Sequence, residues 1–272
     1  MDRNVGFIGT GNMGTAMLRS LVESGLVDAS RLYIFDVDRE KTGKIRKETG
    51  VNVTAGSGEA VDKSDIVILA VKPNAIKQAL ESCKKNFDAS KILVSIAVGV
   101  PIKFYKEILG SDRKVIRAMP NTPALVREGM TLVSPDDLVG AEELQAVKKL
   151  FKCLGRVEEL EEKLMSEVTA LTGSSPAYVH MFIEAMADAA VLSGIPREMA
   201  YRLAAQAVLG SAKMVLDTGK HPGELKDQVC SPGGTTIEAV YALEKNGFRH
   251  AVMEAMNECT KKAREIGKQF EK

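Results

Sequence analysis

The sequence predicts two domains of different class, an α/β domain followed by an all-helical domain. Three observations predict them. The first half of the chain alternates short apolar runs with helix-like segments, which is the pattern of a sheet covered by helices. After about Glu158 the β-branched alternating runs stop, and Ala-, Met- and Leu-rich helical stretches follow. The length of 272 residues suits one large domain or two small ones. We therefore expect domains at residues 1–158 and 159–272.

Six apolar runs in the first half have the length of strands, and helix-like segments separate them. The run Ile66–Val71 is apolar at every position, as parallel strands covered on both faces are. Strand, helix and strand in succession predict right-handed crossovers and a doubly wound sheet. The expected strands are Val5–Gly9, Leu32–Phe35, Ile66–Val71, Ile92–Val98, Val115–Met119 and Thr131–Val133. The helices between them include Met13–Glu23, Arg39–Glu48 and Asn74–Lys84.

The second half is predicted to be helical throughout, with breaks at glycine or proline. The expected helical stretches are Leu160–Leu171, Pro176–Ser193, Arg197–Thr218, Pro222–Cys230 and Thr235–Phe270, the last interrupted at Gly247. Within Pro176–Ser193 apolar residues occupy more than one face of the helix. Such a helix is buried on most sides, which is consistent with packing against a second subunit.

Composition excludes several functional classes. The chain has 37 basic and 36 acidic residues and 5% aromatic residues, so we expect no nucleic acid as the main partner. The four cysteines are scattered without a CxxC pair, which predicts no metal site and reduced thiols in the cytoplasm. The most apolar long stretch, Ala177–Ile195, contains His180, Glu184 and Asp188, so no membrane span is expected. The first residues lead straight into a strand, and we expect no signal peptide.

The turn Gly9–Gly14 follows the first strand and has the pattern GxGxxG. The first glycine permits a tight turn, the second lets the backbone approach a pyrophosphate, and the third allows the helix to pack closely on the strand. The helix N-terminus supplies amide donors and a positive dipole end. Because the pattern lies between a strand and a helix, it predicts a Rossmann domain that binds a dinucleotide.

Asp36 closes the second strand, 22 residues after Gly14. A carboxylate at this position accepts hydrogen bonds from ribose hydroxyls and repels a 2′-phosphate, which favours NADH. However, Arg39 and Lys41 follow closely and would hold a phosphate if Asp36 turned away. The alternative is a solvated turn without a cofactor role, so both NADH and NADPH stay open.

Two further turns are expected at the cofactor cleft, because ligands of open α/β sheets bind beyond the carboxyl ends of the strands. For Lys72, contact with a phosphate or ribose and simple exposure are both possible. The expected cofactor residues in these turns are Ala70, Val71, Lys72, Pro73, Ile96, Ala97 and Val98.

Two helix starts in the second half are rich in capping residues, at 171–178 and at 231–238. In the segment 231–238, glycines leave the backbone exposed, and Thr235 and Glu238 have the spacing of a capping box. Exposed amides and hydroxyls at a helix N-terminus bind small anions such as a carboxylate. Ordinary helix capping without a ligand is the alternative.

Six segments together form a more specific pattern than the glycine turn alone. They are Gly6–Met13, Ala70–Pro73, Arg117–Pro123, Gly173–Tyr178, His221–Asp227 and Ser231–Ile237. In these segments the chain resembles the pyrroline-5-carboxylate reductase family, the bacterial members most of all, and the resemblance extends along essentially the whole length. It implies reduction of 1-pyrroline-5-carboxylate to L-proline by NADPH or NADH, the final step of proline biosynthesis. It also implies a helical domain that forms a homodimer, possible assembly into a larger ring, and an active site between the cofactor domain and helices of the dimer.

The resemblance also implies roles for individual residues. The pyrophosphate turn is implied to comprise Ile8, Gly9, Thr10, Gly11, Asn12 and Met13. Ser57 corresponds to a polar position on the adenine side, and Asn121 to one near the nicotinamide. Gly234, Thr235 and Thr236 are implied to hold the substrate carboxylate and ring nitrogen, and Glu162 to lie near the substrate. Asp36 departs from the family pattern, in which many members have a small polar residue and prefer NADPH.

The chemistry is consistent with the small number of histidines. The chain has three histidines, none with an evident acid or nucleophile partner, and we expect a structural role for His221 in its turn. A cyclic imine carries its own basic nitrogen, so the positioning of substrate and cofactor supplies most of the rate acceleration. We expect the Thr236 hydroxyl to hydrogen-bond that nitrogen and assist proton delivery.

Two alternative functions remain at this stage. A reductase of the β-hydroxyacid dehydrogenase type also joins a Rossmann half to a helical half, but it needs a catalytic lysine, and neither Lys213 nor Lys226 has that setting. A dinucleotide sensor without turnover would not need the 231–236 turn.

Overall fold

A computed structural model describes residues 1–270 of the chain. It divides into two compact units. The α/β unit comprises Met1–Gly173 and the chain from Cys259 onward, and the helical unit comprises Ser174–Glu258. The boundary expected between residues 158 and 159 stays a prediction, and the contacts within the chain divide it after Gly173.

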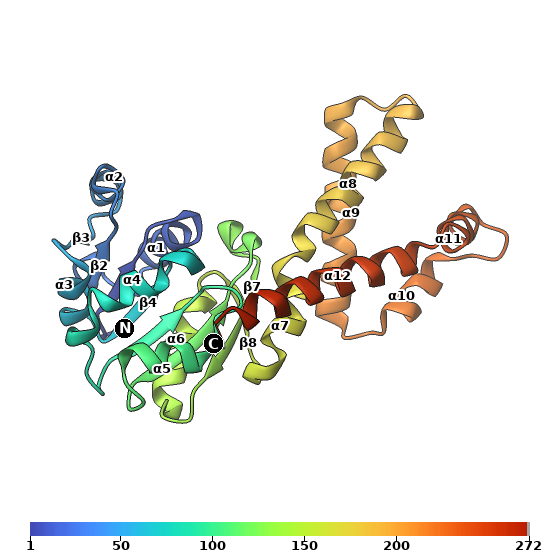
Figure 1. Cartoon of the computed structure of the whole chain (residues 1–272). Coiled ribbons are helices and arrows are strands. Elements are labelled where there is room, and N and C mark those ends of the chain that lie inside the picture. Colours follow the sequence, from blue (N-terminus) through green and yellow to red (C-terminus); the bar gives the residue numbers. More distant parts are fainter. Residues whose placement is uncertain (271–272) are drawn as a thin grey trace. The chain divides into compact units, whose positions relative to one another are not determined.

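The α/β unit is built on one eight-stranded sheet with the order β3-β2-β1-β4-β5-β6-β7-β8 (Figure 1). The strands are β1 (Val5–Ile8), β2 (Leu32–Phe35), β3 (Asn52–Val53), β4 (Ile66–Leu69), β5 (Ile92–Ser95), β6 (Lys114–Met119), β7 (Gly129–Pro135) and β8 (Gly155–Glu159). The first six strands are parallel and have the order of dinucleotide-binding sheets. The predicted α/β fold is therefore confirmed.

Strand β7 runs antiparallel to β6, whereas the other neighbouring strands of the doubly wound sheet are parallel. Only residues 120–128 connect the two strands, and a parallel connection needs a crossover of a dozen residues or more. The short connection therefore requires an antiparallel pair.

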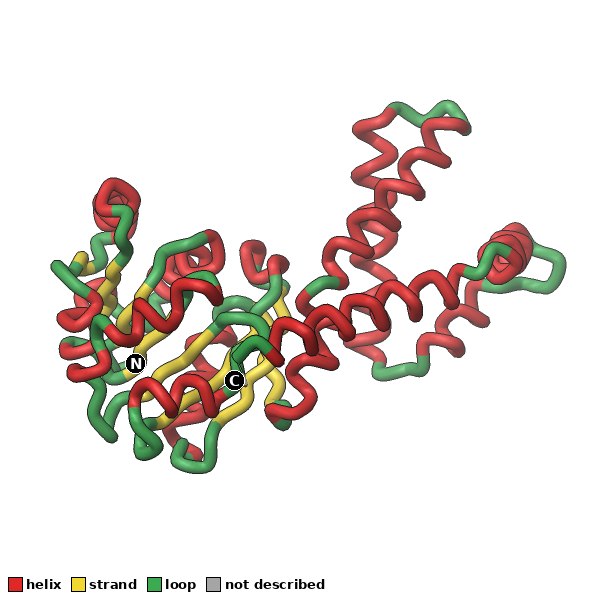
Figure 2. Tube along the Cα trace, viewed as in Figure 1, coloured by secondary structure: helices red, strands yellow, loops and turns green. Residues whose placement is uncertain are grey.

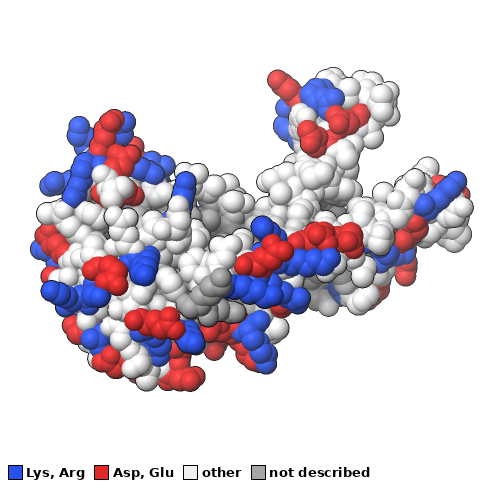
Figure 3. All heavy atoms as spheres, viewed as in Figure 1, with Lys and Arg blue, Asp and Glu red and all other residues white. Residues whose placement is uncertain are grey.

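Helices cover both faces of the sheet, which explains why its strands lack polar alternation. Phe7 packs in a cluster with Met17 of α1, whereas Ile8 packs with Ile76 and Tyr105 on the other face. The helices of this unit are α1 (Asn12–Glu23), α2 (Arg39–Thr49), α3 (Ser57–Asp62), α4 (Ile76–Glu81), α5 (Ile102–Leu109), α6 (Ala141–Lys152) and α7 (Met165–Val168). On the visible face of this unit, basic and acidic side chains are interspersed (Figure 3).

The helical unit contains only helices and their connections (Figure 2). They are α8 (Ser175–Leu192), α9 (Arg197–Thr218), α10 (Pro222–Val229), α11 (Thr235–Lys245) and the first part of α12 (Phe248–Lys268). The predicted all-helical class is confirmed, as is the break at Gly247, which has φ +72°. None of the helices in the described chain is both long and apolar enough to cross a membrane.

The helical unit has almost no core of its own. Its buried apolar side chains within the described structure are those of Ala187, Ala200 and Ala204. In contrast, Met181 is 68% exposed and Leu192 is 90% exposed. Large apolar side chains exposed on the same helix, α8, indicate an interaction surface rather than a finished monomer surface.

The end of α12 belongs to the α/β unit. Arg264 forms a two-pronged ion pair with Glu167, at 2.9 and 2.7 Å, and the ring of Phe270 lies 5.1 Å from that of Phe104 on α5. The last helix thus starts in one unit and ends packed in the other.

Candidate cofactor and substrate sites

The glycine turn lies between β1 and β4, where the strand order of the sheet reverses. Gly9 has φ +97°, and a Cβ atom there would lie 2.7 Å from the Ala70 carbonyl oxygen. A Cβ at Gly14 would lie 2.7 Å from the Gly9 oxygen, whereas at Gly11 the nearest atom is 3.9 Å away. Gly9 and Gly14 are therefore required by packing, and Gly11 leaves open backbone for a ligand.

Helix α1 begins directly after this open backbone. Its N-cap residue is Gly11, which has no side chain to bond the first amide groups. Amides at a helix N-terminus that lack a capping side chain are donors for phosphate oxygens. The turn and the helix start therefore fit a dinucleotide pyrophosphate, as the GxGxxG pattern predicted.

Hydrogen bonds hold the Asp36 carboxylate against the glycine turn. Its Oδ2 accepts hydrogen bonds from the Thr10 amide at 2.6 Å and the Thr10 hydroxyl at 2.9 Å, and its Oδ1 accepts one from the Asp38 amide at 3.0 Å. Burial raises the pKa of this carboxyl, but the hydrogen bonds from Asp38 and Thr10 and the charge of Lys41 outweigh burial and hold the pKa below its usual range. Asp36 is therefore a fixed negative charge at the end of β2.

A cavity of about 310 Å³ opens beside Asp36. Five residues expected to contact the cofactor line it: Ile8, Gly9, Asp36, Ser57 and Val71. The apolar side chains of Phe35, Val37 and Ala79 complete much of its wall. A mostly apolar pocket with a few polar groups is typical of a small-molecule site, and its place at the reversal of strand order is that of an adenosine pocket.

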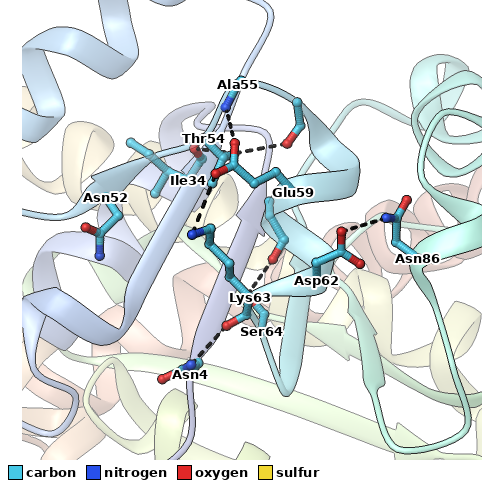
Figure 4. Close-up of polar contacts among 12 residues, drawn as sticks. Asn4, Ile34, Asn52, Thr54, Ala55, Glu59, Asp62, Lys63, Ser64 and Asn86 are labelled. Carbon is cyan, nitrogen blue, oxygen red and sulfur yellow. Dashed lines mark hydrogen bonds and ion pairs between the residues drawn. The ribbon is translucent and has the colours of Figure 1, made fainter.

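Polar contacts hold both ends of α3 (Figure 4), and Ser57, its first residue, lines this cavity. At its start the Ala55 amide donates to Glu59 at 2.7 Å, and near its end Asn86 donates to Asp62 at 2.8 Å. The Ser57 hydroxyl pairs with the Ser82 hydroxyl at 2.8 Å. Ser57 is thus a fixed polar group in a mostly apolar wall.

The guanidinium group of Arg39 is held in place. It lies 5.0 Å from the centre of the Phe35 ring and donates to the backbone oxygens of Thr54, at 2.8 Å, and Ala55. In this position the guanidinium holds the backbone that leads into α3. These two bonds leave further N–H groups of the guanidinium for a phosphate, so the alternative in which Arg39 holds a phosphate stays a prediction.

The residues expected on the nicotinamide side lie in the turn after β5 and the turn after β6. The Ala97 amide donates to the Ser95 hydroxyl at 3.3 Å. Asn121 is engaged at both ends of its amide: its Nδ2 donates to the Thr172 oxygen at 3.0 Å, and its Oδ1 accepts from the Met130 amide at 2.9 Å. Lys72 belongs to the predicted turn of residues 70–73, after β4, and is exposed. The roles of these residues toward the cofactor stay predictions.

Glu162 has partners that the sequence did not reveal. Its Oε1 accepts hydrogen bonds from the Ile102 amide at 2.7 Å and from Nη1 of Arg117 at 2.9 Å. Arg117 is only 7% exposed. A lone arginine inside the apolar run Val115–Met119 is a recognisable signal for a buried charge that needs a partner, and it is the signal that could have assigned Arg117 a role.

The turn before α11 lies in the helical unit. Gly234 is the N-cap of this helix and Thr235 its first residue, so the expected capping box at Thr235 and Glu238 is wrong: the helix begins one residue earlier than such a box requires. Gly233 has φ +66°, and a Cβ at Gly234 would lie 2.3 Å from the Ser231 hydroxyl oxygen. These glycines allow a tight turn and a helix start without a capping side chain.

His221 has a structural role, as predicted. Its Nδ1 accepts a hydrogen bond from the Gly223 amide at 3.0 Å and so caps α10. An imidazole nitrogen that accepts this bond carries no proton of its own.

Comparisons with known proteins relate these features to a family. A family model described as pyrroline-5-carboxylate reductase dimerisation matches residues 162–266, and one described as NADP oxidoreductase coenzyme F420-dependent matches residues 4–99. Pyrroline-5-carboxylate reductase of Escherichia coli (strain K12) is 49% identical over 268 residues, which is 98% of this chain and 100% of that protein. The chain belongs to the pyrroline-5-carboxylate reductase family.

Solved structures of the family agree with this. The structure from Plasmodium falciparum, described with NADP bound, has a TM-score of 0.88 at 33% identity and covers 98% of both chains. The structure from Coxiella burnetii has a TM-score of 0.92 at 32% identity, over 98% of this chain and 99% of that one. The family resemblance noted in the sequence is therefore confirmed, and so is the class of NAD(P)-dependent oxidoreductase.

Proposed function

We propose that this chain reduces 1-pyrroline-5-carboxylate to L-proline with NAD(P)H, as the final step of proline biosynthesis. The observation that carries the proposal is similarity over both units together: 49% identity extends over 98% of the chain. The family model for the helical part names pyrroline-5-carboxylate reductase itself. This favours the proposal over a β-hydroxyacid dehydrogenase and over a dinucleotide sensor.

The α/β unit supplies the cofactor half of the site. Bound NAD(P)H provides the hydride. We infer that the open backbone at Gly11 and the N-terminal amides of α1 hold the pyrophosphate, while Ser57 and the apolar cavity wall hold the adenosine. Asp36 is poised to meet the ribose hydroxyls. The turns 70–73 and 96–98, together with Asn121, are proposed to flank the ribose and nicotinamide.

The helical unit is proposed to supply most of the substrate half. The amides at the start of α11, near Gly234 and Thr235, offer donors and a positive dipole end to the substrate carboxylate. We propose that the hydroxyl of Thr236, the second residue of α11, hydrogen-bonds the ring nitrogen and fixes the plane of the C=N bond. Orientation supplies most of the rate gain in such a reaction, because the imine brings its own basic nitrogen.

The helical unit also accounts for a homo-oligomer. Its matched family model describes dimerisation, and Met181, Leu192 and Met253 are 68%, 90% and 71% exposed, an area that a second copy would bury. We propose a homodimer through this unit and a larger ring of such dimers, which light scattering would distinguish by mass. We also propose the cytoplasm as its location, where free thiols such as Cys83 and Cys153 stay reduced.

The proposal is tested by turnover. The purified protein is expected to oxidise NAD(P)H with 1-pyrroline-5-carboxylate and not with a β-keto acid control; the reverse preference would favour the hydroxyacid class, which reduces the keto group to a hydroxyl. Thr236→Ala is expected to lower kcat/KM by about 100-fold, within the range for one positioned proton donor, with cofactor affinity unchanged. Thr236→Ser keeps the hydroxyl and should retain most of the activity. Loss of cofactor affinity in Thr236→Ala would contradict this division of roles.

A further inference from the structure

The loop of residues 96–101 connects β5 to α5, and it contains the turn that the proposed function assigns to the nicotinamide side. Ala97 and Val100 are buried, whereas Val98 is 40% exposed. Gly99 adopts φ +81°. A loop that must present a short segment to a ligand has to be held at both ends, and the structure shows how this one is held.

The start of the loop rests on a buried pair of hydroxyls. The Ser95 and Tyr105 hydroxyl oxygens lie 2.6 Å apart, and the Ala97 amide donates to the same Ser95 oxygen at 3.3 Å. Tyr105 is fully buried. Burial raises the pKa of its phenol, so the hydroxyl stays protonated at neutral pH and the pair persists.

The end of the loop is held by Glu162. The Ile102 amide, which opens α5, donates to Glu162 Oε1 at 2.7 Å. The preceding residue, Pro101, is the N-cap and has no side-chain acceptor. A carboxylate from 60 residues away along the chain therefore replaces the capping side chain and also meets the positive end of the helix dipole.

Arg117 fixes that carboxylate in turn. Its Nη1 donates to Glu162 Oε1 at 2.9 Å, and in the sheet Arg117 pairs with Ser95. The Nε of Arg117 is buried without a hydrogen-bond partner. An apolar side chain would fill the space of the buried guanidinium at lower cost, because an ion pair seldom repays the desolvation of a buried charge. The pair therefore serves to place Glu162 more than to stabilise the sheet.

The opposite side of the loop is closed by α12. A Cβ atom at Gly99 would lie 2.8 Å from Ile266 Cγ2 and 3.6 Å from the Gly267 amide nitrogen. The loop thus cannot shift toward α12, and it is restrained from the other side by Ser95 and Glu162.

We propose that Arg117 and Glu162 are positioning residues. They hold the 96–101 loop in the position from which it contacts the nicotinamide half of the cofactor. Glu162 then acts through the loop rather than by touching the substrate. This inference rests on the proposed function, because that function assigns residues 96–98 to the nicotinamide side.

The test compares binding of a whole cofactor with binding of a fragment. NADP⁺ contains the nicotinamide, whereas 2′-phospho-ADP-ribose lacks it; NAD⁺ and ADP-ribose form the matching pair. Glu162→Gln is expected to weaken binding of the whole cofactor about tenfold, the value of a hydrogen bond to a charged group, and to leave the fragment within about twofold. Glu162 is 36% exposed, so this variant is expected to fold.

A matched control lies on the same strand. Lys114 of β6 pairs with Glu143 at 2.6 Å, with side chains 22% and 17% exposed. Glu143→Gln removes an ion pair of similar burial without touching the loop, and it should change neither affinity. Arg117→Lys should show the same selective loss as Glu162→Gln, because a lysine cannot reproduce the planar geometry of the guanidinium.

Two outcomes would overturn the inference. One is an equal loss of cofactor and fragment binding in Glu162→Gln, which means a general structural role. The other is unchanged cofactor affinity with a raised KM for 1-pyrroline-5-carboxylate, which means a direct substrate contact. Failure of the proposed function is distinct: the unmodified protein would not reduce the imine, whereas the binding comparison needs no turnover.

Discussion

Replacing Asp36 by asparagine tests how this chain selects its cofactor. The carboxylate accepts three hydrogen bonds from Thr10 and Asp38, and its lowered pKa keeps it ionised at neutral pH. A unit charge repels another at contact distance in water by about 1 kcal/mol, and a phosphate monoester carries about −1.5 to −2 charges. The carboxylate therefore disfavours a 2′-phosphate by about 1.5–2 kcal/mol, or about ten- to thirtyfold.

Asp36→Asn removes the charge and keeps the shape. We expect the ratio of kcat/KM for NADPH to that for NADH to rise by this factor, and the rise to shrink at high salt because the charges are screened. The variant also weakens charge-assisted hydrogen bonds, so the free energy of unfolding should fall by about 1 kcal/mol. Steady-state kinetics with both cofactors at saturating substrate measure the ratio.

Asp38→Asn is the matched control. Asp38 caps α2 through the Lys41 amide at 2.9 Å, asparagine caps helices equally well, and Asp38 does not line the cavity beside Asp36. The ratio should stay unchanged in this variant. A ratio that moves by less than about twofold in Asp36→Asn, or that moves as much in Asp38→Asn, would refute the assignment of cofactor selection to Asp36.

Two other predictions concern packing. Gly14→Ala places a Cβ atom 2.7 Å from the Gly9 oxygen and should lower the free energy of unfolding, measured by urea titration, by about 1–3 kcal/mol. Gly43→Ala in α2, where the Cβ atom meets nothing within 4 Å, should be neutral or stabilising. Similar losses in both variants would contradict the steric argument. Met181→Glu puts a charge on the exposed apolar surface of α8 and should lower the mass measured by light scattering to that of a monomer. Leu138→Glu, which replaces a side chain 45% exposed in the α/β unit, should leave the mass unchanged. An intact oligomer in Met181→Glu would exclude this surface from the interface.

Much of the fold could be predicted because its elements have strong patterns. The run Ile66–Val71 is apolar throughout and forms a buried strand, and helix α9 has the predicted bounds Arg197–Thr218. Two strands were missed for physical reasons. Strand β3 has only two residues, and β8, with the sequence GRVEE, is a largely exposed edge strand. Neither has enough apolar residues to show a period.

The site was partly predictable in the same way. Glycine spacing located the turn Gly9–Gly14 because the steric requirement is local. The partners of Asp36 and Glu162 were not predictable, since each is defined by contacts between distant segments. The pairing of Glu162 with Arg117 joins residues 45 apart in the chain, and no local pattern records such a contact. The start of α11 at Thr235 was predicted, but its N-cap is Gly234 and not Thr235, because a serine- and threonine-rich turn offers several possible caps.

The central claim, imine reduction by this chain, is tested most directly by measuring product. The purified protein is incubated with 1-pyrroline-5-carboxylate and NADPH or NADH, and L-proline and oxidised cofactor are quantified together. We expect L-proline and oxidised cofactor in equal amounts, and formation of both about 100-fold slower in Thr236→Ala at substrate concentrations below KM. Cofactor oxidation without L-proline, or no oxidation with either cofactor, would contradict it.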